Sequence, residues 1–223
     1  MSLIRKSPLH DVAAALQPEW GAINDMPVAL QFDHGDGQRM ATLGIADLSG
    51  LWRHGLKGPG SIAWLEAQGI VIPAVNSWAE LAEGGLIARL GRTEFMLEDE
   101  PNGTTARRVQ SLLAVERPYG VYPVLHQDAA LMLTGTAVQR LLRQTCSFNF
   151  MALDAATQPL VLTTMVGVAV TVLPVATADG VHSRIWCDGT YGEYLWHTLL
   201  DIAHELDGGA VGLNYLILEG KSQ

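Results

Sequence analysis

The stretch LKGPGSIAWL, residues Leu56–Leu65, decides the fold class because its frame returns in LTGTAVQRLL, residues Leu133–Leu142. In each stretch a Leu-x-Gly sequence closes an expected strand, and an expected helix carrying an apolar pair follows. A strand–turn–helix unit used twice predicts an α+β domain with two related halves. We therefore expect one domain over residues 1–223, with halves of roughly 1–125 and 126–223. Chance similarity is the alternative, since few positions are fixed.

The segments on either side continue the alternation of strands and helices. Short apolar stretches alternate with glycine over residues 41–60, which predicts strands, and residues 86–100 predict a hairpin. A helix is expected from about Thr105 and another over residues 136–146. Residues 159–177 are rich in the β-branched side chains that are typical of strands.

The clearest predicted helix lies within TYGEYLWHTLLDIAHELDGG, residues 190–209. Its apolar residues recur at the i, i+4, i+7, i+11 spacing of one buried stripe, namely Leu195, Leu199, Ile202 and Leu206. We expect Gly208–Gly209 to end this helix.

Capping and loop signals mark the earlier part of the chain. Ser61 is expected to cap a short helix at its start, and Gly69 is expected to end that helix. The polar, glycine-rich residues Phe32–Met40 predict an exposed loop.

The composition argues against a nucleic-acid partner. Hydrophobic residues make up 48% of the 223 residues and charged residues 17%, below the roughly 25% charged residues of typical soluble domains. This indicates a large core, an apolar surface meant for a partner, or both. The formal net charge of −9 would repel phosphate backbones, and Arg107–Arg108 is the only tight basic cluster.

The cysteines and the N-terminal residues bear on the compartment. Cys146 and Cys187 match neither a metal-binding spacing nor a secreted disulfide framework, so buried unreactive thiols are the favoured interpretation. The apolar run near the N-terminus is too short and too polar for a signal peptide or a membrane span. We therefore expect a cytoplasmic protein without membrane contact.

No sequence motif supplies a complete catalytic site. GLKGPG, residues 55–60, has its glycines in the wrong order for dinucleotide binding, and GKS, residues 220–222, only imitates the end of a phosphate loop. The Gly-x-Ser-x-Gly turn of a serine hydrolase is absent from the sequence.

Two groups of polar residues could form sites, each with a structural alternative. Glu193, His197 and Asp201 share one helical face that could hold a metal, but a solvated polar face is favoured and we predict no metal site. His54, with Arg53 beside it, could line a pocket, but a buried structural histidine is favoured.

Segments along nearly the whole chain resemble the folate-binding aminomethyltransferase fold, which is that of the T-protein of the glycine cleavage system. These segments are SPLHD (7–11), MPV (26–28), and residues 43–65, 130–142 and 191–213. The resemblance implies an α+β fold of duplicated ferredoxin-like α/β units, without the third domain of full-length T-proteins.

Within this fold, the chain looks most like the gamma subunit family of heterotetrameric sarcosine oxidase. The likeness lies in its length and in CSFNF (146–150), LTT (162–164) and YLWHTLL (194–200).

One departure from the aminomethyltransferases concerns catalysis. In the catalytic members, an "Asp-Asp-Leu-Ile-Val" strand start carries an aspartate that contacts folate, and the matching segment here is Gly84–Ala88. The resemblance therefore puts Gly85 where the working aspartate would stand, and glycine has no acid–base group. We expect no catalytic residue on this chain. Glu83 is the nearest acid, and with His54 and Arg53 it is a candidate for binding a cofactor.

The resemblance implies a non-catalytic gamma-type subunit of a sarcosine oxidase-like flavoenzyme that acts on N-methyl amino acids. Its partners would be the larger alpha and beta flavoprotein subunits, which are expected to carry the flavins and NAD. This chain would hold no cofactor, although tetrahydrofolate is possible. The alternative is a stand-alone, tetrahydrofolate-binding aminomethyltransferase-like protein of one-carbon metabolism. A third interpretation is a binding module of the same fold with an unrelated ligand.

Overall fold

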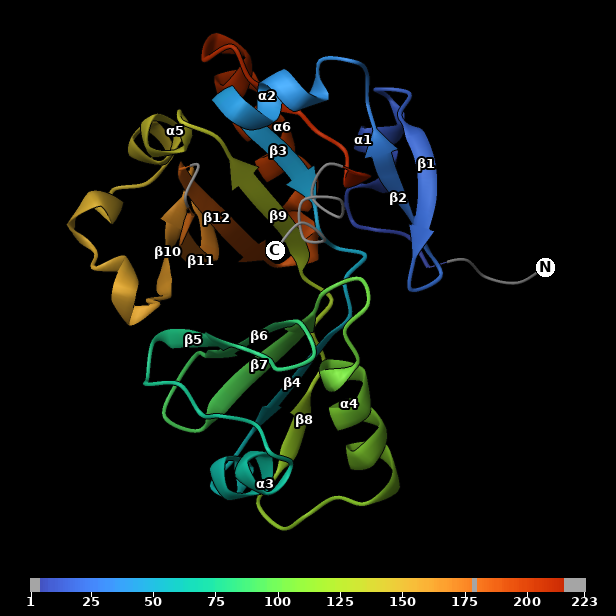
Figure 1. Ribbon diagram of the computed structural model, residues 1–223, viewed down its shortest axis with the longest axis vertical. Coiled ribbons are helices and arrows are strands. Elements are labelled where there is room, and N and C mark those ends of the chain that lie inside the picture. Colours follow the sequence, from blue (N-terminus) through green and yellow to red (C-terminus); the bar gives the residue numbers. More distant parts are fainter. Residues whose placement is uncertain (1–4, 178–179, 215–223) are drawn as a thin grey trace. The chain divides into compact units, whose positions relative to one another are not determined.

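The computed structural model describes residues 5–177 and 180–214, which form two compact units (Figure 1). Of the described residues, unit 1 takes those within 5–50, 128–155 and 161–214, and unit 2 takes residues 51–127 and 156–160. The chain therefore leaves unit 1 and returns to it, so the compact units do not coincide with the expected halves 1–125 and 126–223. A duplication that relates these halves stays a prediction.

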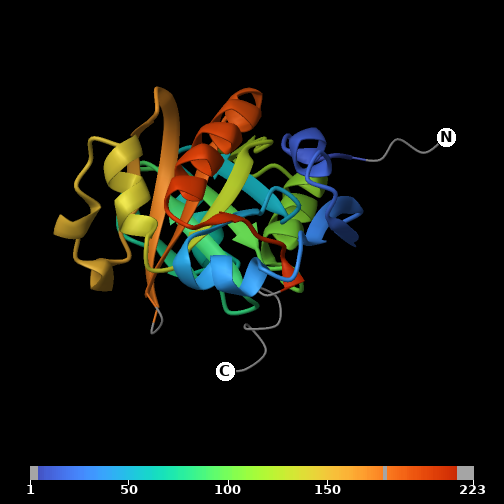
Figure 2. The same ribbon diagram turned by 90° about the horizontal axis from the view of Figure 1, so that it is seen from above.

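Unit 1 is built on a six-stranded sheet. Its strands, in spatial order, are β10 (Val161–Met165), β11 (Val168–Thr177), β12 (Gly180–Cys187), β9 (Ala129–Thr134), β3 (Gly44–Asp47) and β13 (Gly209–Ala210). Neighbouring strands are antiparallel, except that β13 is parallel to β3. Helices α5 (Val138–Thr145) and α6 (Gly192–Glu205) lie side by side over one face of this sheet (Figure 2).

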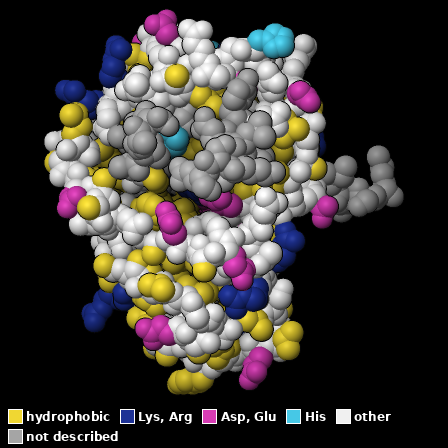
Figure 3. All heavy atoms as spheres, viewed as in Figure 1, with side chains coloured by type: hydrophobic (Ala, Val, Ile, Leu, Met, Phe, Trp, Pro, Cys, Tyr) yellow, Lys and Arg dark blue, Asp and Glu magenta, His cyan; other side chains and the backbone are white. Residues whose placement is uncertain are grey.

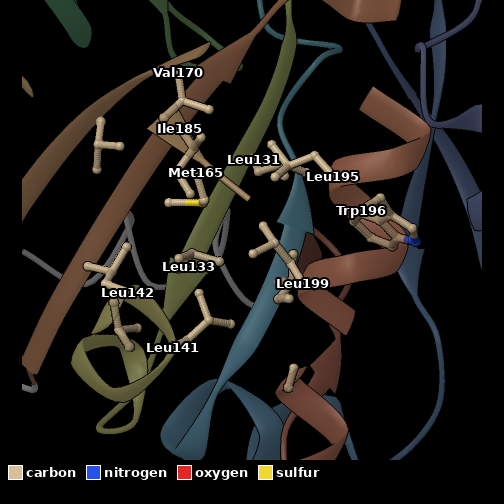
Figure 4. Close-up of a cluster of buried hydrophobic side chains, with 14 of the residues drawn as sticks. Leu131, Leu133, Leu141, Leu142, Met165, Val170, Ile185, Leu195, Trp196 and Leu199 are labelled. Carbon is tan, nitrogen blue, oxygen red and sulfur yellow. The ribbon is translucent and has the colours of Figure 1, made fainter. Parts of the chain in front are cut away.

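The core of unit 1 lies between this sheet and its two helices (Figure 4). Alternate residues of β9, among them Leu131 and Leu133, point to the helices because successive strand residues face opposite sides. The expected faces of both helices are confirmed. In α5 these residues are buried: Val138, Leu141, Leu142 and Thr145. In α6, Leu195 and Leu199 are buried and Ile202 is partly buried, and Leu206, which caps the helix at its C-terminal end, is also buried.

The remainder of unit 1 is a hairpin with short helices. Its elements are α1 (His10–Ala14), β1 (Glu19–Ile23), β2 (Met26–Gln31), α2 (Asp36–Thr42) and the 3-10 turns η1 (Phe150–Ala152) and η3 (Gly189–Tyr191); a third such turn, η2 (Ala155–Thr157), ends in unit 2. The predicted exposed loop Phe32–Met40 is wrong, because α2 begins within it and the carboxylate of Asp36 is fully buried.

Unit 2 is built on a five-stranded antiparallel sheet with two helices on one face. The strands, in spatial order, are β5 (Ser77–Glu80), β6 (Gly85–Arg89), β7 (Glu94–Asp99), β4 (Arg53–Lys57) and β8 (Tyr122–Val124). Helices α3 (Ser61–Ala67) and α4 (Thr105–Val115) bury Leu65, Val109 and Leu113 against Leu56 and Phe95 of the sheet. The predicted hairpin over residues 86–100 and the helix from about Thr105 are confirmed.

The predicted strand–turn–helix motif is present at both positions, once in unit 2 and once in unit 1. Gly58 follows β4 with φ +121°, and Gly135 follows β9 with φ +100°. The helix begins three residues later in both cases, at Ser61 and at Val138. A left-handed glycine is required at each turn because a Cβ would press on backbone atoms of Gly120 or Thr42.

Three expected helix boundaries had different outcomes. Gly69 ends α3 as predicted, with φ +76° and its N–H donated to the carbonyl of Glu66. The predicted cap at Ser61 is wrong, because Gly60 is the N-cap and Ser61 is a buried first residue of the helix. After α6 the left-handed residue is Asp207, with φ +58°, instead of Gly208 or Gly209. The phosphate-loop imitation at residues 220–222 lies outside the described residues.

Candidate functional site

Gly85, where the resemblance implies a lost aspartate, is the first residue of β6 and pairs with Asp99 of β7. Its φ is +103°. A Cβ built on Gly85 would collide with the carbonyl oxygen of Glu98 and would lie 2.9 Å from the Cα of Asp99. The position therefore excludes any side chain for a steric reason, in addition to lacking a carboxylate.

Asp99 is the buried acid directly across the ladder from Gly85, and it holds helix α4 in place. Its carboxylate is fully buried and accepts hydrogen bonds from the backbone N–H groups of Ala106, at 2.8 Å, and Arg107, at 3.1 Å. Burial raises the pKa of Asp99, although these backbone hydrogen bonds act against the rise. The carboxylate is thus committed to the N-terminus of a helix, where a negative charge is favourable.

Glu83, the nearest acid in the sequence, also contacts the start of α4. It is exposed, and its Oε2 accepts hydrogen bonds from the hydroxyls of Thr104, at 2.5 Å, and Thr105, at 3.3 Å. The Thr104 hydrogen bond in particular keeps the pKa of Glu83 below its ordinary value. Glu83 is therefore an ionised surface group that is oriented by a helix start.

Arg53 and His54 do not form one site, although they are adjacent in the sequence. Arg53 pairs across the ladder with Glu98, with Nη1 3.2 Å from Oε2, and both side chains are buried. His54 points to the opposite face of β4, toward the helices, as does Leu56 of the core. Arg53 and His54 are neighbours in the sequence, but their side chains lie on opposite faces of β4 and cannot share one site.

His54 fits the structural interpretation that the sequence favoured. It is buried, and among the described residues its Nε2 has no hydrogen-bond partner. Burial, with a smaller effect of His126, lowers the pKa of His54, so the imidazole is neutral near pH 7. His126 itself lies over Gly55, where a Cβ would collide with the imidazole ring.

The other candidates from the sequence are exposed or buried as follows. His197 and Glu193 on α6 are exposed, with Nε2 4.0 Å from Oε1. Within residues 5–177 and 180–214, no three His, Cys, Asp or Glu side chains are placed to share a metal ion. Cys146 and Cys187 are buried free thiols, as expected. Burial raises the pKa of Cys187 to about 11, which disfavours the reactive thiolate.

Sequence reasoning missed Asp99, Glu98 and His126. For Asp99 a signal was present, since an acid two residues before a Pro-Asn-Gly turn that leads into a helix can accept from the first helical amides. The positions of Glu98 and His126 near Arg53 and Gly55 follow from the register of β7 and β8 against β4, which the sequence does not reveal. The acids near Gly85 thus stabilise the start of helix α4, and Glu98 forms a cross-strand ion pair with Arg53.

Comparison with known proteins finds similarity at the level of structure. No protein-family profile matches the sequence, and no curated protein matches it. The fold is similar to that of glycine cleavage system aminomethyltransferase T from Bartonella henselae, with a TM-score of 0.73 and 14% identity over 95% of this chain and 60% of that chain. It is also similar to a chain of heterotetrameric sarcosine oxidase from Corynebacterium sp. U-96, with a TM-score of 0.66 and 21% identity over 94% of this chain and 100% of that chain.

These similarities confirm the predicted fold class. The chain has a mixed α+β, aminomethyltransferase-like fold, and it spans 60% of the aminomethyltransferase chain. In the part of the chain that is described, every helix is too short or too polar to cross a membrane.

Proposed function

We propose that this chain is a non-catalytic, gamma-type subunit of a heteromeric flavoenzyme that oxidises N-methyl amino acids, as sarcosine oxidase does. The observation that carries the proposal is the extent of the structural match. It covers 100% of a chain of heterotetrameric sarcosine oxidase and 94% of this one, but only 60% of the aminomethyltransferase. This chain thus corresponds to a whole subunit of the former and to a part of the latter.

The geometry at Gly85 supports the non-catalytic role. A carboxylate at this position would need β7 to move, because Glu98 and Asp99 occupy the space with backbone atoms. The buried acid that pairs with Gly85 across the ladder, Asp99, is engaged by the start of α4. In the proposed assembly the flavins and NAD are carried by the larger alpha and beta subunits.

Co-expression tests the proposal. The chain is produced together with large flavin-bearing subunits of the sarcosine oxidase type, and the mixture is separated by size-exclusion chromatography. We expect this chain to co-elute with them in a fixed ratio, in a complex that oxidises sarcosine or a related N-methyl amino acid. Elution of this chain alone, while the large subunits elute as a separate complex, would overturn the proposal.

The second candidate is a stand-alone tetrahydrofolate-binding, aminomethyltransferase-like protein of one-carbon metabolism. Its support is the TM-score, which is higher for the aminomethyltransferase, at 0.73, than for the sarcosine oxidase chain, at 0.66. Calorimetric titration of the isolated chain with tetrahydrofolate separates the candidates, because only the second predicts micromolar binding without any partner. Arg53→Ala and Glu83→Ala then test two of the three candidate cofactor-binding residues, which lie on different parts of unit 2.

A further inference from the structure

Strand β1 is the outer strand of the β1–β2 hairpin of unit 1 and pairs with β2 on one side only (Figure 1). The hairpin turns through residues 24–25, both in the left-handed region, and Ile23 pairs with Met26 beside this turn. In a two-residue hairpin the pair beside the turn is hydrogen bonded, and bonded and non-bonded pairs then alternate. The N–H and C=O groups of Trp20 and Ala22 therefore point away from β2, along the outer edge of β1.

The partner strand shows the same alternation, but its outer edge is in use. Pro27, which pairs with Ala22, has no N–H to donate, and Ala29, which pairs with Trp20, accepts a hydrogen bond from the N–H of Leu213. On β1 both Trp20 and Ala22 are exposed. In the described part of the chain, no strand or turn outside the hairpin is hydrogen bonded to their backbone groups. The fold thus closes one edge of the hairpin and leaves the other open.

The remaining sheet edges among the described residues are protected in recognisable ways. Met165 of β10 forms a bridge with Cys146, and Trp78 of β5 donates its N–H to the carbonyl of Gln158. Strand β8 has Pro123 at its centre, and β13 is only two residues long. Covering segments, proline, lysine and short strands are the usual means of preventing edge pairing. Strand β1, with the sequence EWGAI, has none of them.

The sequence of β1 is complementary to itself about Gly21. If two copies pair antiparallel with Gly21 at the centre, Trp20 of each copy lies opposite Ala22 of the other. Both pairs then exchange N–H···O=C hydrogen bonds, because all these groups point outward, and each indole packs beside a small side chain. The one charged residue of β1, Glu19, lies opposite Ile23 of the other copy. The two Glu19 carboxylates therefore stand at opposite ends of the ladder.

The charge of the chain and the closure of the sheet favour a second copy as the occupant of this edge. The net charge is −9, and Asp and Glu side chains are spread over the face drawn in Figure 3, so a contact between copies needs an uncharged centre. The centre of β1, Trp20–Ala22, is uncharged. Two-fold pairing also leaves no open edge, because the outer edge of β2 is engaged by Leu213. Such a contact is closed and finite, whereas a strand of another protein would bring an edge of its own.

We propose that β1 is a dimerisation edge, through which two copies of this chain pair antiparallel about Gly21 into a continuous sheet β2–β1–β1–β2. Backbone hydrogen bonds supply the affinity in this mode of recognition. The ring of His10, whose centroid lies 4.8 Å from that of Trp20, restrains the indole before the contact forms. A pair of five-residue strands buries less than the roughly 1,600 Å² of a standard interface, so the dimer is weak and depends on concentration. The inference does not rest on the proposed function, because it concerns the isolated chain.

Sedimentation velocity of the isolated, full-length chain tests the proposal from low to high micromolar concentration. We expect the mass to rise from that of one chain to that of two. Ala22→Pro removes an outward N–H and leaves the β1–β2 hydrogen bonds intact, since that N–H points away from β2. This variant should weaken the dimer at least about tenfold. The matched control, Ala22→Ser, keeps the N–H and should change the dissociation constant by less than about twofold.

Amide hydrogen exchange of the unmodified chain gives a second readout, which decides the question if Ala22→Pro lowers the melting temperature or does not fold. The amides of Trp20 and Ala22 should exchange more slowly at high than at low protein concentration, because the dimer protects them. The amide of Gly21 is the internal control. It is hydrogen bonded within the hairpin, so its exchange should not depend on concentration.

Three results would overturn the proposal. The first is a monomer at every concentration. The second is a dimer that Ala22→Pro leaves unchanged, with exchange at Trp20 and Ala22 independent of concentration, because another surface then forms the dimer. The third is protection of these two amides only when large flavoprotein subunits are added. That result would assign the edge to a strand of such a subunit and would at the same time support the proposed function.

Discussion

Asp36 of unit 1 and Asp99 of unit 2 are both fully buried carboxylates, but they are compensated in different ways. Asp36 accepts the N–H groups of Phe32 and Asp33, each at 3.1 Å, and of Gly212, at 2.8 Å, and forms an ion pair with the guanidinium of Arg39. Asp99 accepts the N–H of Ala106 and of the next residue, at the N-terminus of α4. A buried charge needs partners, which are backbone amides together with a hydrogen-bonded cation in unit 1 and the amides of a helix start in unit 2. Both acids are used by the fold, and neither is available for chemistry.

Each of these acids lies near a glycine that lets two backbone segments meet. A Cβ on Gly212 would collide with the carbonyl group of Leu30, and a Cβ on Gly85 would collide with the carbonyl oxygen of Glu98. In unit 1 the close approach joins the chain after β13 to β2, and in unit 2 it joins the first residue of β6 to β7. At Gly85, where the resemblance to aminomethyltransferases implies a lost acid, backbone atoms of β7 thus occupy the space that a side chain would need.

The largest expected loss of stability comes from replacing the buried acids, and we expect it to differ between Asp36 and Asp99. Asp36→Asn leaves the buried side of Arg39 without its nearest negative charge, and removing one member of a buried ion pair costs about 3–5 kcal/mol. Asp99→Asn keeps an oxygen that accepts from an α4 amide, so a loss of about 1–2 kcal/mol is expected. Urea unfolding of the isolated chain measures both values.

Asp33→Asn is the matched control for Asp36→Asn. Asp33 also contacts Arg39, at 2.8 Å, but its side chain is 60% exposed, so a loss below about 1 kcal/mol is expected. Equal losses for Asp36→Asn and Asp99→Asn would show that the type of compensation does not matter, and would contradict the comparison.

The next effect concerns the two glycines before and at the start of β6. Gly85→Ala places a methyl group against the backbone of β7, and we expect a loss of about 2–4 kcal/mol from strain and overpacking together. Gly84 has a similar φ, +85°, but the nearest atoms to a Cβ there, which belong to the Glu100 side chain, lie 3.8 Å away. Gly84→Ala should therefore cost only about 1–2 kcal/mol.

Gly85→Asp extends this test to function. Because the carboxylate cannot enter without moving β7, we expect this variant to be destabilised and to gain no tetrahydrofolate binding in a calorimetric titration. A stable Gly85→Asp protein that binds tetrahydrofolate would contradict the steric argument and favour the second candidate function.

The sequence predicted local structure well wherever periodicity or a turn residue carried the information. The buried stripe of α6 and the strand–Gly–helix turns at Gly58 and Gly135 were predicted from short segments, because the interactions that form them are local. The exposed loop at Phe32–Met40 was wrong because Asp36 is buried by a hydrogen bond to Gly212, which lies 176 residues away. No pattern within the loop encodes that partner.

The candidate site was predicted only in part, for a similar reason. The family resemblance located Gly85, but the steric reason for its glycine is the backbone of β7, which only the register reveals. Arg53 and His54 were grouped because they are neighbours in sequence. The period of two in a strand already argued against that grouping, since adjacent residues face opposite sides.

The smallest expected effect is on the pH dependence of stability, and it concerns a buried base, His54, instead of a buried acid. Burial lowers its pKa in the folded state, so the unfolded chain, with an ordinary value of about 6.5, binds the proton more readily. The contribution of His54 to stability is therefore fully present above about pH 6.5 and is lost as the pH falls below that value toward the lowered folded pKa, by at most about 1.4 kcal/mol per pH unit. Urea unfolding from pH 7.5 to 5 should show this slope in the unmodified chain and a flatter one in His54→Gln. His197→Gln, which removes an exposed histidine of α6, should keep the original slope, and a slope unchanged by His54→Gln would contradict the assignment.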